Sequence, residues 1–204
     1  MKGSHKTMKV NTIFPVFPFT ALMGVSTCLQ LNVTAISARD GSSTLECWQV
    51  GQPFTRLGAP GRVDAMLGGV STISYGIRPA NHDAGIHNAP GNEWVVVIGL
   101  AYFTLPGDNV TGAYVSSGRS SLIFAADTAD VSRTGHRTQY PGDIETIVLH
   151  IPTHDGKVPD HSFLHMGPCG IDDLVGIREF GQGADPDQHM FEARDGTAWP
   201  FQLW

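Results

Sequence analysis

The chain has 204 residues, which is enough for one domain with a sizeable core. It contains 24 Gly and 13 Pro, and 16% of its residues are charged, so the composition argues against a helical bundle and favours short strands joined by turns. The net charge of −6 excludes a broad basic surface for nucleic acid.

Residues 1–38 have the pattern of a secretory signal peptide. Three lysines lie within the first nine residues, and 10–38 contains no charged residue. An apolar core over 13–31 is followed by the small residues "TAISA". We predict cleavage near Ala35 or Ala38, a secreted or secretory-pathway protein, and no membrane association afterwards. A membrane anchor is the alternative, which two prolines and several polar residues in the apolar run disfavour.

Two further features are consistent with export. Cys47 and Cys169 remain after removal of the leader, and an oxidising compartment would let them form a disulfide. Two buried free thiols are the alternative. Asn109 lies in an "NVT" sequence within a turn-rich loop, which makes it a candidate glycosylation site.

Segments with strand character recur at short intervals along the chain. They cover 44–50, 70–77, 93–105, 120–127 and 144–151. Gly99 interrupts the longest segment and is expected to form a bend or bulge. Turn sequences separate the strands and no crossover helices intervene, so the pattern predicts an antiparallel sandwich or barrel. One short helix is expected over 171–180, followed by a C-terminal tail at 181–204.

Histidine and carboxylate side chains in two strand-like segments suggest a metal site. His87 and Glu93 flank the turn in "GIHNAPGNEW", and His136 begins "HRTQYPGD". Imidazole and carboxylate together suit Mn, Fe, Zn, Ni or Cu. Strand alternation places Tyr140 on the face of His136 and Arg137 on the opposite face. The alternative for each candidate is a turn or strand-edge residue without a ligand role.

These motifs resemble those of the cupin superfamily, whose fold is a double-stranded β-helix, or jelly-roll barrel. The match is nearest to secreted fungal cupin-like proteins, in "CW" at 47–48, "PFT" at 53–55, "HNAP" with "WVV", and "FAADTADVSRTGHRTQYPGD" at 124–143. The resemblance covers about 45 to 170. It implies an all-β cupin barrel over 39–180, and a homodimer is compatible with it.

The resemblance also implies a mononuclear metal held by His87, Glu93 and His136, with Tyr140 as a further pocket residue. Ala89 stands where the family has a second histidine. Two functions therefore stay open. One is an enzyme of isomerase, cyclase, decarboxylase or dioxygenase type that acts on a small organic molecule, as in fungal secondary metabolism. The other is a metal-free protein that binds a small molecule without catalysis.

The remaining polar residues are assigned to the surface or to turns. His82 and Asp83 could supply a fourth donor, although a surface loop is the favoured interpretation. Asp127 and Asp130 are expected to shape a turn. Four histidines near the C-terminal end are predicted to be surface residues: His150, His154, His161 and His165.

Overall fold

The computed structural model describes residues 29–56, 62–108 and 110–174, and these residues form strands and loops without a helix. The prediction of an all-β fold is confirmed. The strands are β1 (Gln30–Arg39), β2 (Ser42–Pro53), β3 (Thr55–Arg56), β4 (Val63–Asp64), β5 (Ser74–Arg78), β6 (His82–His87), β7 (Glu93–Ile98), β8 (Leu100–Thr104), β9 (Gly112–Ser116), β10 (Leu122–Ala125), β11 (His136–Tyr140), β12 (Thr146–Pro152) and β13 (His161–Met166).

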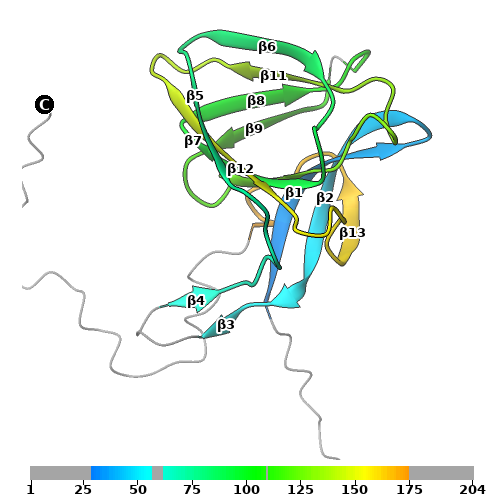
Figure 1. Ribbon diagram of the computed structural model, residues 1–204, viewed down its shortest axis with the longest axis vertical. Helices are drawn as coiled ribbons and strands as arrows, with labels where there is room; N and C mark the ends of the chain where they lie inside the picture. The colour runs from blue at the N-terminus through cyan, green and yellow to red at the C-terminus, as the bar shows by residue number, and fades with distance from the viewer. Residues whose placement is uncertain (1–28, 57–61, 109, 175–204) are drawn as a thin grey trace, which may run out of the picture.

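Two sheets form the body of the molecule (Figure 1). The larger has the order β13-β2-β1-β10-β7-β12-β5, and the smaller has the order β6-β11-β8-β9. Ile36, Val97 and Val148 of the larger sheet belong to the same buried cluster as Phe103 and Val115 of the smaller sheet. This shared core between two sheets is compatible with a β-sandwich.

The larger sheet also buries its other face. Because side chains alternate along a strand, Val33 and Ala35 of β1 lie on the face opposite Ile36. There they join a second cluster that contains Trp48, Trp94 and Phe124. Burial on both faces explains why β7 and β10 are nearly continuous apolar runs rather than alternating ones.

The bend predicted at Gly99 is present, and it connects the two sheets. It lies between β7 of the larger sheet and β8 of the smaller, with φ at +129°. A Cβ atom at this position would lie 2.6 Å from the Thr146 hydroxyl oxygen. Only glycine meets both constraints, so the chain can leave one layer and enter the other here.

The predicted boundary at residue 38 requires correction. β1 occupies Gln30–Arg39, pairs antiparallel with β2 and parallel with β10, and is therefore an internal strand of the larger sheet. A cut near Ala35 or Ala38 would remove most of this strand and its buried side chains. The β domain thus begins by Gln30 rather than at 39, and a leader that leaves the sheet intact must end before it. Residues 1–28 lie outside the described part.

The C-terminal expectations are corrected in part. Residues 171–174, the start of the expected helix, form a turn in which Asp173 N–H donates to the Gly170 carbonyl. The rest of that segment, the tail at 181–204 and Asn109 lie outside the described residues. Within 29–56, 62–108 and 110–174 the structure holds no helix with the length and apolar character of a membrane span.

The predicted disulfide is present. Cys47 in β2 is bonded to Cys169 in the segment after β13, across a sequence separation of 122 residues. Such a bond is compatible with an oxidising environment.

Candidate functional site

The four predicted site residues line one cavity between the two sheets. His87, Glu93, His136 and Tyr140 all contribute to its wall, and the cavity has a volume of about 50 Å³. Apolar side chains complete it, among them Val95, Phe103, Ile123 and Val148. The volume suits a water molecule or a metal ion with one further ligand, but not a whole organic molecule.

The pairing of β6 with β11 brings the two predicted histidines together. His87 is the cross-strand partner of His136, and their ring centroids lie 4.7 Å apart. Gly135 makes this approach feasible. Its φ is +63°, and a Cβ atom there would lie 2.7 Å from the His87 carbonyl oxygen. The glycine before His136 therefore lets the two strands meet at the cavity.

A buried carboxylate holds His136 in one orientation. His136 Nδ1 lies 2.8 Å from Asp127 Oδ2, and Asp127 is fully buried. The same oxygen accepts a hydrogen bond from Ser43 Oγ at 2.7 Å, while Oδ1 accepts from the Ala89 N–H at 3.3 Å. Because Nδ1–H donates to Asp127, the Nε2 lone pair of His136 is left for a ligand. The prediction that Asp127 only shapes a turn missed this contact.

A second carboxylate and histidine are paired in the same cavity. Glu93 Oε1 accepts a hydrogen bond from His150 Nδ1 at 2.9 Å, and Glu93 is buried. His150 Nε2 lies 3.4 Å from Arg78 Nη2, which is a donor, so both ring nitrogens have partners. His150 lines the cavity rather than the surface, which corrects the prediction for this residue. Alternation with the buried Thr146 and Val148 in β12 is the signal that could have revealed it.

His87 lies at the mouth of the cavity, where its side chain is still exposed. Its Nδ1 lies 3.3 Å from the Gly85 carbonyl oxygen, to which it can donate. Partial burial lowers the pKa of His87, and the neighbouring His136 lowers it further. The ring is therefore neutral at neutral pH, with its Nε2 lone pair available as a base or a metal ligand.

Alternation along β11 is confirmed. His136, Thr138 and Tyr140 face the cavity, whereas Arg137 is exposed. Thr138 Oγ1 is buried and has no hydrogen-bond partner within the described part of the chain. A buried hydroxyl without a partner is costly, so a bound water or ligand atom would satisfy it. Thr138 is therefore a candidate to bind a water molecule or a ligand atom in the cavity.

His82 and Asp83 are exposed and do not line the cavity, as predicted, but they lie in strand β6 and not in a loop. The ring centroid of His82 lies 6.2 Å from that of Tyr140. Asp83 pairs with Arg137, with Nε 3.1 Å from Oδ2, and so joins β6 to β11 on their outer face. This ion pair supports the strand pairing that aligns His87 with His136.

The Asp83–Arg137 pair leads to a prediction on pH. Hydrogen bonds from Arg137 and from the Gly85 N–H lower the pKa of Asp83 from 3.8 to about 2. A lowered pKa in the folded state stabilises the fold above pH 3.8, and this contribution disappears as the pH falls through about 2. We expect Arg137→Gln to raise the pKa of Asp83 towards 3.8, measured by NMR titration of the carboxyl carbon. An Asp83 that already titrates near 3.8 in the wild type would contradict the pairing.

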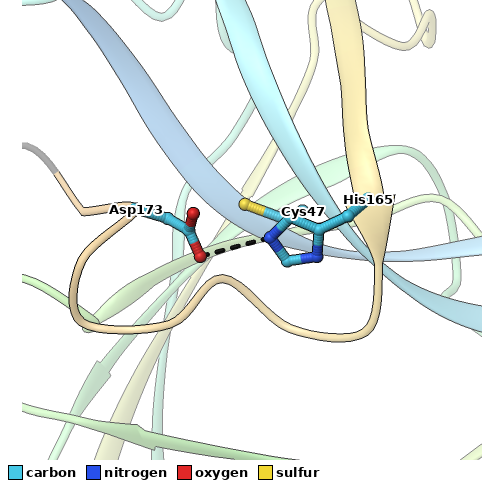
Figure 2. Close-up of side chains that lie close together, drawn as sticks. All are labelled: Cys47, His165 and Asp173. Atoms are coloured by element: carbon cyan, nitrogen blue, oxygen red, sulfur yellow. Dashed lines mark hydrogen bonds and ion pairs between the residues drawn. The ribbon is translucent and has the colours of Figure 1, made fainter.

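A separate group of potential metal ligands lies around Cys47, in the middle of β2. The ligand atoms of Cys47, His165 and Asp173 all lie within 4.8 Å of one another, the one such group of three among the described His, Cys, Asp and Glu residues (Figure 2). Cys47 is in the disulfide, however, so its sulfur is not a thiolate. The cavity donors are spaced more widely, and metal binding there requires side chains to rotate inwards.

Comparison with known proteins supplies no assignment. No protein-family model, no curated protein and no solved structure matches the chain.

Proposed function

We propose that the protein is a cupin-type enzyme that acts on a small organic molecule at the cavity, with a mononuclear transition metal held by His87, Glu93 and His136. One observation carries the proposal: the two buried side chains, His136 and Glu93, are each oriented by an outer hydrogen-bond partner, and the exposed His87 has one backbone acceptor. Asp127 holds His136, His150 holds Glu93, and the Gly85 carbonyl accepts from His87. Outer partners of this kind are typical of metal ligands, because they set the tautomer and orientation of the donor atom.

The donor set also suits a metal chemically. Two imidazoles and one carboxylate leave coordination positions open for a substrate, and the set is compatible with Fe, Mn, Zn, Ni or Cu. Ala89 removes a fourth donor without removing the other three. When bound, such a metal would supply Lewis-acid polarisation of a carbonyl or enolate oxygen. The exposed position of His87 leaves it free to rotate towards the buried pair.

The chain's own residues position the substrate. Phe103, Ile123 and Val148 exclude water from the inner wall, which strengthens every polar interaction inside. Thr138 Oγ1 is a free polar atom for one substrate group, and the Tyr140 side chain lines the same wall. Because the cavity holds few atoms, the reacting group enters and the rest of the substrate lies at the mouth beside His87 and Pro90. Isomerisation, cyclisation, decarboxylation and oxygenation of such a molecule, as in fungal secondary metabolism, all fit this arrangement.

One observation favours a second function, a metal-free protein that binds a small molecule. Glu93 is buried but already paired with His150 at 2.9 Å, so the carboxylate needs no ion. The apolar wall and Ala89 would then surround an apolar group, and Thr138 would bind its one polar atom. For either function we propose a secreted protein. The Cys47–Cys169 bond supports this, and glycosylation at Asn109 would be consistent with it.

Substitution of Glu93 by glutamine distinguishes the two functions. Glu93→Gln removes the charge and keeps the shape and a hydrogen-bond acceptor for His150. If the site holds a metal, we expect affinity to fall by about 100-fold. If it holds an apolar ligand without metal, we expect little change. The measurement is metal content and affinity, by mass spectrometry and calorimetry, on full-length protein purified without chelator or histidine tag.

Two further variants test whether the metal is bound in the cavity. His136→Ala should remove the metal while circular dichroism shows that the sheets remain. His154→Ala, an exposed histidine outside the cavity, should leave metal content unchanged. Wild-type protein that takes up none of the five metals in stoichiometric amount would exclude the metal-dependent enzyme and leave the binding protein.

A further inference from the structure

The middle of β2, at Cys47, carries a cluster that shares no residue with the cavity. The pairing of β2 with β13 places Cys47 opposite His165. The segment after β13 then turns back, so that Cys169 reaches Cys47 and Asp173 reaches His165. Figure 2 shows the Cys47 sulfur beside the His165 ring and the Asp173 carboxylate. With Cys169, the cluster has two sulfur atoms, one imidazole and one carboxylate.

Contacts other than the disulfide hold this segment in place. Cys169 N–H donates to Thr34 Oγ1 at 3.0 Å, and Gly170 N–H donates to Asp173 Oδ2 at 2.6 Å. Asn32 Nδ2 donates to the Asp173 carbonyl at 2.6 Å. These hydrogen bonds tie the turn to β1 and to itself. The four side chains are therefore kept near one another by backbone pairing and hydrogen bonds as well as by the sulfur–sulfur bond.

His165 is oriented as a metal ligand would be. Its Nδ1 lies 3.0 Å from the Met166 carbonyl oxygen, to which it donates, and its Nε2 lies 3.2 Å from Asp173 Oδ2. Without a metal, a proton between Nε2 and Oδ2 makes the contact with Asp173 a hydrogen bond. A metal ion between Nε2 and Oδ2 would take the place of that proton.

We propose that the Cys47–Cys169 bond gates a zinc site, which forms from Cys47, Cys169, His165 and Asp173 when the bond is reduced. In the oxidised protein both sulfur atoms are bonded to each other and cannot act as thiolates. Two thiolates, one imidazole and one carboxylate in a tetrahedral set are the donors that Zn²⁺ prefers. Half-exposed His165 and Asp173 provide a path by which the ion enters.

A phosphine can serve as the reductant of the Cys47–Cys169 disulfide. The disulfide, one phosphine and one water give two thiols and one phosphine oxide, so the sulfur atoms gain two electrons that phosphorus loses. Cys169, which is half-buried, is the accessible sulfur, whereas Cys47 is fully buried. Zinc then displaces the two thiol protons, together with the Nε2 proton of His165 where that ring is charged.

Cobalt(II) tests the site and separates it from the cavity. Full-length protein is titrated with Co²⁺ before and after anaerobic reduction by a phosphine, followed by Zn²⁺ to displace the cobalt. We expect a sulfur-to-cobalt charge-transfer band and tetrahedral d–d bands in the reduced protein alone, with affinity at least about 100-fold higher than in the oxidised protein. A metal in the cavity would have no sulfur ligand, and its affinity would not change when the disulfide is reduced. The experiment therefore tests the two metal sites separately.

Variants complete the test. Asp173→Asn and His165→Gln keep the disulfide, and each should weaken the reduced site by about 10-fold or more. His154→Ala replaces an exposed histidine in the loop before β13 and should not weaken metal binding by the reduced site. If the reduced chain loses its circular dichroism, recovery on adding Zn²⁺ supports the site. A reduced protein that shows no sulfur–cobalt band, stays unfolded with Zn²⁺, or binds equally well in all three variants overturns the proposal.

Discussion

A chain in which Cys47 and Cys169 are both alanine is expected to have a free energy of unfolding about 5 kcal/mol lower than the wild type. The bond links residues separated by 122 positions, so in the unfolded chain it closes a loop that spans most of the β domain. Without it the unfolded state gains the entropy of that loop, while the native strands keep their other contacts. Cys47 is fully buried, and its loss also leaves a small void in the larger sheet.

Urea denaturation followed by circular dichroism measures this effect. Ser162→Ala, an exposed position that faces Gln49 in the β13–β2 pair, is the matched control and should change stability by no more than about 0.5 kcal/mol. Wild-type protein with its disulfide reduced, measured without added metal, should resemble the double variant. An unchanged denaturation midpoint in the double variant would show that the bond does not constrain the unfolded chain.

Asp127→Asn is expected to cost about 1–3 kcal/mol of stability and, if the cavity holds a metal, about 10- to 100-fold in metal affinity. Asp127 accepts from Ser43 Oγ and His136 through one oxygen and from the Ala89 N–H through the other. An asparagine has one acceptor and one donor at these positions. In either orientation its NH₂ group faces a buried donor, so at least one hydrogen bond is lost and His136 loses its negative partner.

Asp130→Asn provides the comparison, because Asp130 lies three residues away and is exposed. We expect this variant to have the same denaturation midpoint as the wild type and to bind the same metal with unchanged affinity. NMR of the His136 ring offers a second measurement, since the Nδ1 proton should be protected from exchange only when Asp127 accepts it. Equal stability and equal metal affinity for the two variants would mean that Asp127 does not position His136.

Local patterns in the sequence were enough to predict several features of the fold. The strands over 93–105, 120–127 and 144–151 were recognisable because apolar and branched residues bounded by turn sequences are a short-range signal. Gly99 marked a bend in the chain because glycine tolerates a positive φ. The inward side chains of β11 followed from strand alternation, which depends on neighbours in the chain alone.

Other features depended on which strands pair, and only the tertiary structure shows that pairing. Residues 30–38 carry no charge because the central part of β1 is buried on both faces, and a leader is uncharged as well. Glu93 and His150 are 57 residues apart in sequence, and the β7–β12 register makes them partners. Asp127 and His136 are nine residues apart, and the turn between them brings the carboxylate to the His136 ring. Residue types and alternation therefore revealed His87, Glu93 and His136, whereas the pairing of Glu93 with His150 emerged from strand pairing that no local pattern encodes.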